Sequence, residues 1–183
     1  MKISIALCTY NGEKYISDQI QSLLSQTRLP DEIVISDDGS SDHTIAIVES
    51  LLRNSNIKYQ VFKQIPSLGV YKNFEFCMKA CQFDLIFPCD QDDVWKKDKL
   101  EKHLKMHESH EDKVLVYSNA DVVQNTIDHY LYPLWDPKKI ANQTYSSQSN
   151  MLYLGKSIAG CCLSIRRDFF QNILPIPSDI YHD

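Results

Sequence analysis

The chain has 183 residues, of which 43% are hydrophobic and 23% charged, a composition typical of one globular domain with one substantial core. Its formal net charge of −5 and its pI near 5.6 argue against the clustered basic surface that nucleic-acid binding needs. No apolar run approaches the roughly 18 residues of a membrane span, and the N-terminal stretch MKISIALCTYNG has too few apolar residues for a signal peptide.

The first half of the chain alternates between short apolar runs and apolar stripes at helical spacing. Four strands are predicted at IALC (5–8), EIVIS (32–36), KYQVF (58–62) and DLIFP (84–88). Three helices between them are predicted from the stripes Ile16, Ile20, Leu23, Leu24; Ile45, Val48, Leu51, Leu52; and Val70, Phe74, Cys77, Met78, Cys81. Asp42 is the predicted N-cap of the second helix. This order predicts an α/β fold, Rossmann-like, with a mostly parallel central sheet and helices on both faces.

The second half of the chain is less regular. A further helix is expected after Asp98, and KVLVYSNADVV (113–123) predicts one or two strands. Residues 124–157 are polar, aromatic and broken by proline, and we expect a long excursion on the ligand side of the sheet. IAGCCLSI (158–165) predicts a strand, and RRDFFQNIL (166–174) predicts a helix.

Cysteine and histidine raise the question of a structural zinc site. Cys77 and Cys81 lie four residues apart, as do His103 and His107, and the four side chains could in principle bind zinc. No pair has CxxC spacing, and the two histidines continue an apolar helical stripe, so packing histidines are favoured. We expect the six cysteines to be reduced in a cytoplasmic protein.

Three polar motifs follow the first, second and fourth predicted strands. They are TYNG (9–12), DDGSSD (37–42) and DQDD (90–93). In a parallel sheet the three loops emerge at one carboxyl edge, where open α/β sheets bind ligands. TYNG and DDGSSD are also common turn sequences, so each of these two motifs alone is equally consistent with a turn.

The DQDD motif points more strongly to a ligand, because a turn needs no third carboxylate. Asp90, Asp92 and Asp93 would repel one another unless a cation lay between them. Carboxylate oxygens suit Mg²⁺ or Mn²⁺, which complete their coordination with substrate phosphates and water. An EF-hand is excluded, because Trp95 stands where that loop needs glycine. A metal-bound diphosphate is therefore the predicted ligand.

The other two loops offer groups that could read a nucleoside. Asp38 could accept a hydrogen bond from the imide N–H of uracil or thymine, which cytosine lacks. Tyr10 could stack on the base. Neither GxGxxG after the first strand nor GxxxxGK[ST] anywhere is present, which excludes a Rossmann dehydrogenase and a P-loop NTPase.

The series ALCTYNGEKYI, SLLSQTRLPDEIVISDDGSSDHT and FDLIFPCDQDDVW resembles the family-two inverting glycosyltransferases, which have the GT-A fold. DQDDVW, LGVYKNF (68–74) and AGCCLSIRRDFF look most similar to the bacterial rhamnosyltransferases of that family. The resemblance implies a UDP- or TDP-sugar donor, with TDP-rhamnose as one candidate, and Mn²⁺ or Mg²⁺ as cofactor. It implies a glycan or lipid-linked acceptor. The protein is then expected to be cytoplasmic and to associate with the inner face of the membrane without spanning it.

The resemblance also assigns roles to individual residues. It implies that Asp92 binds the metal directly and that Asp90 faces the ribose or a metal-bound water, with Asp93 in support. The donor pocket that it implies is lined by Cys8, Thr9, Tyr10, Asn11, Glu13, Asp38, Asp90 and Gly160.

The catalytic base that the resemblance implies is Asp183, in the pair His182-Asp183 at the last position. We expect a frayed terminal residue there, and a single domain over residues 1–183 that lacks the C-terminal extension of full-length relatives. Donor binding should then survive while transfer is impaired.

Two alternatives stay open on sequence alone. One is a non-catalytic nucleotide-sugar-binding module. The other is a haloacid-dehalogenase-like phosphatase with Asp90 as nucleophile and Asp92 as acid/base, although that motif would be expected on the first strand rather than the fourth.

Overall fold

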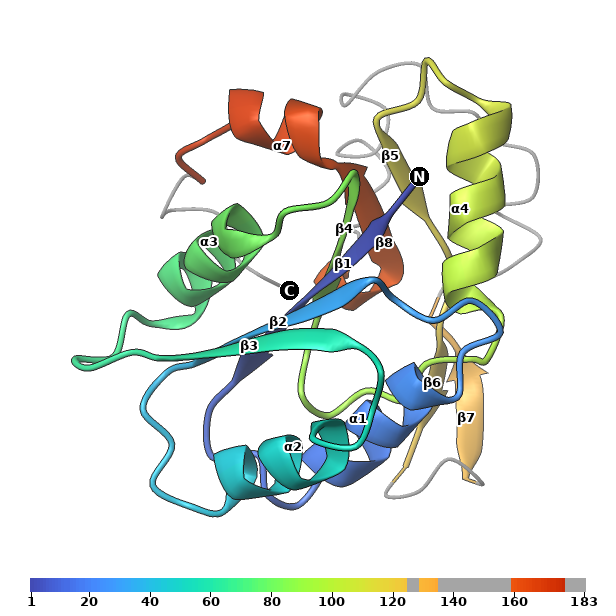
Figure 1. Cartoon of the computed structure of the whole chain (residues 1–183). Coiled ribbons are helices and arrows are strands. Elements are labelled where there is room, and N and C mark those ends of the chain that lie inside the picture. Colours follow the sequence, from blue (N-terminus) through green and yellow to red (C-terminus); the bar gives the residue numbers. More distant parts are fainter. Residues whose placement is uncertain (125–128, 135–158, 177–183) are drawn as a thin grey trace.

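The computed structural model describes residues 1–124, 129–134 and 159–176, which form a central sheet with helices packed around it (Figure 1). The strands are β1 (Ile3–Thr9), β2 (Glu32–Asp37), β3 (Lys58–Lys63), β4 (Leu85–Cys89), β5 (Leu115–Tyr117), β6 (Asp121–Val123), β7 (Tyr130–Pro133) and β8 (Leu163–Arg166). The helices are α1 (Ile16–Leu24), α2 (Thr44–Leu52), α3 (Val70–Ala80), α4 (Lys99–Ser109) and α7 (Arg167–Asn172), with a 3-10 turn η1 (Gly160–Cys162).

The main sheet confirms the predicted α/β architecture. Its strand order is β3-β2-β1-β4-β8-β5, with β1 parallel to β2 and to β4, and β2 parallel to β3. Among the described strands of this sheet, only β8 is antiparallel to the others, and it pairs with β4 and β5. In the sheet, β2 lies on one side of β1 and β4 lies on the other. The carboxyl edge beside β1 is therefore the switch point at which such sheets bind ligands.

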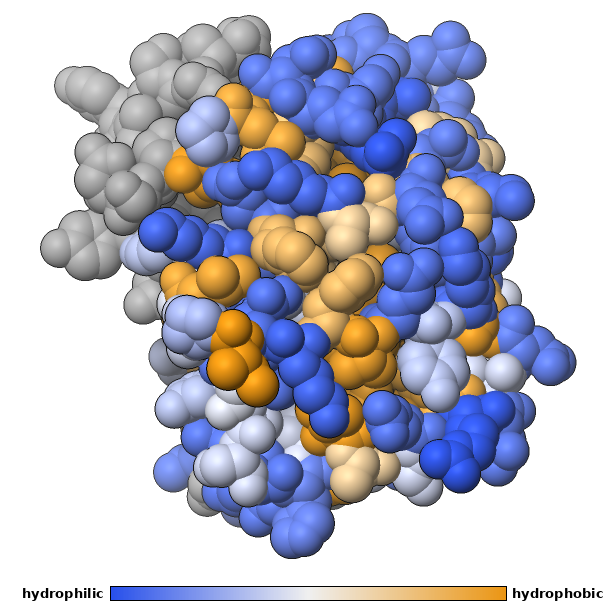
Figure 2. All heavy atoms as spheres, turned by 60° about the vertical axis from the view of Figure 1, so that its left-hand side comes forward, coloured by the Kyte–Doolittle hydropathy of each residue, from blue (hydrophilic) through white to orange (hydrophobic). Residues whose placement is uncertain are grey.

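Two apolar layers cover the sheet, which is why its central strands read as continuous apolar runs. Ile3, Ile5 and Leu7 of β1 point into the layer formed with α1, α2 and α4, whereas Ala6 and Cys8 point into the layer formed with α3 and α7. Figure 2, which turns the left-hand side of Figure 1 forward, shows apolar side chains gathered on the surface of the second layer.

The histidine prediction is confirmed, and the zinc alternative is wrong. His103 and His107 are buried, and both contact the Oγ of Ser164, at 2.8 and 3.0 Å. Cys77 and Cys81 lie in the layer on the other face of the sheet, so the four side chains cannot share an ion.

Two boundary predictions are wrong. Helix α2 begins at Thr44 and its N-cap residue is His43, not Asp42. The carboxylate of Asp42 instead accepts a hydrogen bond from the backbone N–H of Thr44, at 3.0 Å. The predicted strand 158–165 begins only at Leu163, because Gly160 to Cys162 form a 3-10 turn.

The region 113–123 forms two strands, within the predicted range. Strand β6 pairs with β7 in a separate antiparallel ribbon, which accounts for the described part of the predicted excursion 124–157. The rest of that excursion lies outside the described residues. Within the described ranges, no helix is both long and apolar enough to cross a membrane.

Candidate functional site

The three polar loops meet at the carboxyl edge of the sheet, as the strand directions require. Gln91 joins the third loop to the first: its Oε1 accepts a hydrogen bond from Tyr10 N at 2.9 Å, and its Nε2 donates to Tyr10 O at 3.1 Å. Asn11 joins the first loop to the second, because its N–H donates to Ser40 Oγ at 2.8 Å and its Oδ1 accepts from Ser41 N at 2.9 Å. The loops therefore form one connected surface.

Gly12 permits the close approach of the first and third loops. A Cβ at this position would lie 2.2 Å from Gln91 Oε1, so only glycine fits beside the amide in its present position. The backbone N–H of Gly12 donates to Thr44 Oγ1 at 2.7 Å, which ties the same point to the start of α2.

Glu13, a predicted donor-binding residue, here connects the first and second loops. Its Oε2 accepts hydrogen bonds from the backbone N–H and the Nδ1 of His43, at 2.9 and 3.0 Å. These bonds lower the pKa of the Glu13 carboxyl. Its carboxylate therefore helps to build the site's framework.

The residues at the end of β1 differ in accessibility. Cys8 is buried, and burial raises the pKa of its thiol. Thr9 is also buried, and its Oγ1 donates to Asp37 Oδ1 at 2.7 Å. Tyr10 is 57% exposed. Of these three predicted pocket residues, only Tyr10 is exposed enough to stack on a base, while Cys8 and Thr9 are buried at the end of β1.

Asp38 is buried and holds the segment that leads into α3. Its Oδ2 accepts hydrogen bonds from Ser67 Oγ and Gly69 N, at 2.6 and 3.0 Å, and its Oδ1 accepts one from Leu68 N at 2.6 Å. Gly69 adopts a positive φ of 78°, which lets the backbone turn over the carboxylate. A carboxylate oxygen can accept two hydrogen bonds, so Oδ1 keeps capacity for one further donor such as a base N–H.

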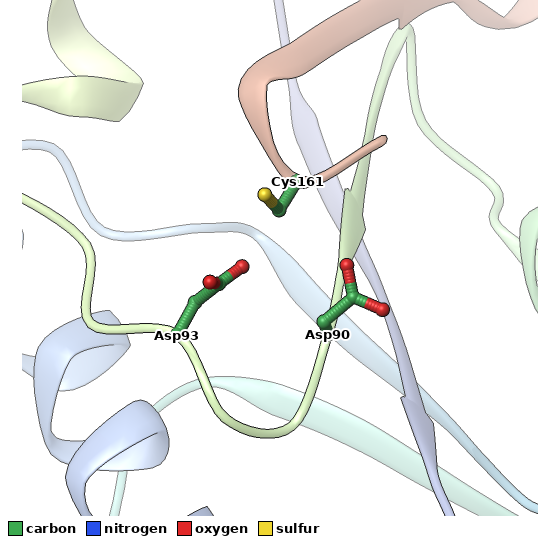
Figure 3. Close-up of side chains that lie close together, drawn as sticks. All are labelled: Asp90, Asp93 and Cys161. Atoms are coloured by element: carbon green, nitrogen blue, oxygen red, sulfur yellow. The ribbon is translucent and has the colours of Figure 1, made fainter. Parts of the chain in front are cut away.

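The DQDD motif forms a tight turn after β4. Such a turn brings its first and fourth residues together, here Asp90 and Asp93, and leaves Asp92 exposed near its tip. Cys161 of η1 approaches the two carboxylates, and one potential ligand atom from each of the three side chains lies within 4.8 Å of the others (Figure 3). Gly160, a predicted donor-binding residue, is the first residue of the same 3-10 turn.

Asp93 is a partly buried carboxyl group whose surroundings act on its pKa in opposite directions. Burial raises the pKa of Asp93, while a hydrogen bond with Cys161 and the charge of Lys99 act in the opposite direction. Its Oδ2 is buried and has no hydrogen-bond partner within the described part of the chain. An orphaned carboxylate oxygen beside a second carboxylate fits a divalent cation, because oxygen ligands suit Mg²⁺ and Mn²⁺.

Lys99 of α4 links the η1 turn to Trp95. Its ammonium donates to the backbone carbonyl of Cys161 and lies 3.6 Å from the ring centroid of Trp95. Burial lowers the pKa of Lys99. Trp95 therefore contacts the Lys99 ammonium, which in turn holds the backbone of Cys161 in position.

The structure adds three residues to the site that the sequence did not predict there: Gln91, Lys99 and Cys161. The four-residue spacing of DQDD could have indicated that Asp93 rather than Asp92 pairs with Asp90, since that pairing follows from turn geometry. Asp183, the predicted base, lies outside the described residues.

Comparison with known proteins places this geometry in context. The model of the family described as glycosyl transferase family 2 matches residues 4–174. The dTDP-rhamnosyl transferase RfbG of Shigella flexneri is 29% identical over 170 residues, which cover 88% of this chain and 54% of the relative. The chain thus spans about half the length of this curated relative.

Solved structures share the fold. The crystal structure of S. aureus TarS with UDP-GlcNAc superposes with a TM-score of 0.70 at 22% identity, covering 94% of this chain and 47% of that chain. The mannosyltransferase PcManGT of Pyrobaculum calidifontis, with GDP-Man and Mn²⁺, gives a TM-score of 0.71 at 16% identity, covering 100% of this chain and 49% of that chain. These neighbours are GT-A glycosyltransferases, so the predicted GT-A fold class is confirmed.

Proposed function

The chain belongs to glycosyl transferase family 2, and we propose that it binds a nucleoside-diphosphate sugar at the carboxyl edge of its sheet and transfers the sugar to a glycan or lipid-linked acceptor. The observation that carries this proposal is the connection of the three loops by Gln91, Asn11 and Glu13 into one surface. Family membership also argues against the phosphatase alternative.

The donor is proposed to be a UDP- or TDP-sugar. Asp38 Oδ1 keeps room for a hydrogen bond from the imide N–H of uracil or thymine, and the exposed ring of Tyr10 can stack on the base. Rhamnose is the candidate sugar because RfbG is described as a dTDP-rhamnosyl transferase. The buried Cys8 and Thr9 would shape the floor of this pocket.

Asp92 and Asp90 are the residues proposed to hold Mn²⁺ or Mg²⁺. Asp92 is exposed at the turn, where it can reach a diphosphate, and Asp90 stands at the end of β4. When bound, the cation would stabilise the negative charge of the departing nucleoside diphosphate. PcManGT, with Mn²⁺ in its structure, makes a divalent cation a reasonable expectation here.

Transfer is proposed to proceed with inversion, by a single displacement at the anomeric carbon. A carboxylate would remove the proton of the acceptor hydroxyl as it attacks, and Asp183 is the residue proposed for this step. A lipid-linked acceptor would bring the protein to the inner face of the membrane.

A thermal-shift experiment tests donor binding. UDP, TDP, CDP and GDP are added with and without Mn²⁺ to the wild type, to Asp92→Ala and to the control Asp112→Ala, whose exposed carboxylate pairs with Lys113 away from the site. We expect stabilisation by UDP or TDP that needs the metal, about 2.7 kcal/mol at a hundredfold excess over Kd. Asp92→Ala should lose it and Asp112→Ala should keep it. No stabilisation by any nucleotide with metal would contradict the proposal.

Nucleoside diphosphate release from a panel of sugar donors with glycan acceptors then tests transfer. Release that stops in Asp183→Asn, with UDP binding retained, is the expected result. Binding without release under every condition would instead support the non-catalytic module.

A further inference from the structure

The loop that joins β3 to α3, residues 64–69, carries an apolar side chain that the fold leaves in water. Figure 1 shows this 64–69 loop projecting at the left-hand edge of the molecule. Ile65 is 87% exposed, more than any other large apolar side chain in the described part of the chain, and Val70, where α3 begins, is 57% exposed. Water is an unfavourable environment for such side chains, so an apolar surface that took them up would be favoured.

Hydrogen bonds hold the 64–69 loop in its projecting position. At its start, the backbone N–H of Gln64 donates to Asp37 O at 2.8 Å. At its end, the carboxylate of Asp38 accepts three hydrogen bonds from residues 67–69. Because both ends are anchored, Ile65 is presented outward by an ordered loop. A partner that binds Ile65 therefore has little conformational entropy to remove.

The same part of the chain is basic, in contrast to the rest. Residues 58–80 contain four lysines and one acidic residue, a net charge of +3 in a chain with a net charge of −5: Lys58, Lys63, Lys72 and Lys79 against Glu75. Glu75 already pairs with Lys79. Lys63 and Lys72, on either side of the 64–69 loop in the sequence, are exposed and form no ion pair with any described residue. The loop therefore joins an apolar tip to a local excess of positive charge.

The face beside the loop continues this pattern. In Figure 2, apolar side chains form a group on the surface of the layer that contains α3 and α7, with hydrophilic side chains around them. Segments that lie on membranes combine apolar side chains, which enter the boundary between headgroups and acyl chains, with lysines, which attract anionic headgroups. A fluid bilayer accommodates a projecting loop, whereas a protein partner would need a complementary surface of about 800 Å².

We propose that the 64–69 loop docks on an anionic lipid bilayer, with Ile65 inserted at the headgroup level and with Lys63 and Lys72 facing the anionic headgroups. This inference deepens the proposed function and rests on its lipid-linked acceptor. Asp38, which anchors the loop, is also the residue proposed to bind the base of the donor. Docking through this loop thus brings the carboxyl edge of the sheet to the lipid surface, where such an acceptor is held.

Vesicle sedimentation at low ionic strength tests this surface without nucleotide or acceptor. The protein is mixed with vesicles of equal parts phosphatidylglycerol and phosphatidylcholine, or of phosphatidylcholine alone, and the bound fraction is measured over a range of lipid concentrations. The loop variants are Ile65→Ser and the double variant Lys63→Gln/Lys72→Gln. Circular dichroism establishes that each variant is folded.

Helix α4, which packs in the other apolar layer, offers matched controls. Met106→Ser removes a side chain that is 47% exposed, and Lys102→Gln/Lys105→Gln removes two exposed lysines, so these controls make the same kinds of change away from the loop.

We expect the wild type and both α4 controls to bind the anionic vesicles and to bind phosphatidylcholine alone much less. Lys63→Gln/Lys72→Gln should weaken binding by roughly fivefold for each lysine removed. Ile65→Ser should weaken it by roughly threefold or more, since the headgroup region buries the side chain only in part.

Three outcomes would overturn the membrane site. The first is a wild type that does not bind anionic vesicles, and the second is unchanged binding in either loop variant. The third is an equal loss of binding in the α4 controls. Retention of the protein on immobilised polyglutamate, with no binding to vesicles, would also overturn it and would indicate an acidic protein partner. UDP stabilisation is measured separately, so a protein that binds UDP but no vesicle refutes the membrane site alone.

Discussion

Replacement of Gly12 by alanine should disturb the site through a single contact. The new Cβ would lie 2.2 Å from Gln91 Oε1 and 2.5 Å from its Cδ, too close for any real contact. The Gln91 side chain is flexible at its end and can rotate away, so the backbone need not move. Rotation, however, breaks both hydrogen bonds that Gln91 makes with the backbone of Tyr10.

The size of the effect follows from those two bonds. An intramolecular hydrogen bond contributes about 0.5 to 1.5 kcal/mol to stability. Both bonds are exposed to solvent, which can replace them in part. We therefore expect Gly12→Ala to lower the free energy of unfolding by about 1 to 2 kcal/mol. Tyr10 would also lose its anchor, so UDP binding should weaken.

Urea unfolding of a double-mutant cycle checks this reasoning. Gln91→Ala alone should lose about the same free energy as Gly12→Ala, since each removes the same two bonds. In the Gln91→Ala background the added methyl meets no amide, and Gly12→Ala should then change stability by less than about 0.5 kcal/mol. If Gly12→Ala is equally destabilising in both backgrounds, the clash with Gln91 is not its cause and the reasoning is refuted.

Three further predictions concern the framework. Asp38→Asn replaces an acceptor oxygen by an NH₂ group that faces at least one of the three donors from residues 67–69, so urea unfolding should show a loss of about 1 to 3 kcal/mol without any nucleotide. Burial lowers the pKa of His103 to about 3, below the value in the unfolded state, so the unfolded state binds the extra proton as pH falls. The free energy of unfolding should therefore decrease below pH 6.5, by up to about 1.4 kcal/mol per pH unit. In His103→Gln the free energy of unfolding should depend less steeply on pH between 6.5 and 5, and an unchanged dependence would contradict this. Phe87→Ala removes a fully buried ring that packs against Trp95. Urea unfolding should show a loss of about 3 to 5 kcal/mol in the free energy of unfolding, with a reduced near-ultraviolet circular dichroism signal. A loss below about 1 kcal/mol would mean that the apolar layer closes around the cavity.

The sheet could be predicted from the sequence because burial on both faces leaves a local signature. Ile33 and Ile35 enter one layer and Val34 the other, so the strand reads as an unbroken apolar run. The position of His103 was predictable for a similar reason, since it continues the apolar stripe of its helix. The convergence of the three loops followed from strand direction alone.

The errors arose where local pattern and tertiary contact differ. IAGCC reads as an apolar strand, yet Gly160 to Cys162 form a 3-10 turn whose carbonyl at Cys161 bonds with Lys99 from another helix. The approach of Cys161 to Asp93 depends on the antiparallel pairing of β8 with β4, which no short motif encodes. Likewise, the contacts of Asp38 with residues 67–69 come from a loop without a distinctive pattern.

The DQDD turn shows how four successive residues acquire three separate roles. Turn geometry directs the first and fourth carboxylates, Asp90 and Asp93, toward each other and toward Cys161. The second residue, Gln91, faces the first loop and bonds with Tyr10, a role that an aspartate could not fill because it has no N–H to donate. The third, Asp92, is left exposed toward the proposed diphosphate. Exchanging the identities of positions 91 and 92 would keep the composition and charge of the loop. It should nevertheless abolish both the bond with Tyr10 and metal-dependent UDP binding, because each role depends on position within the turn.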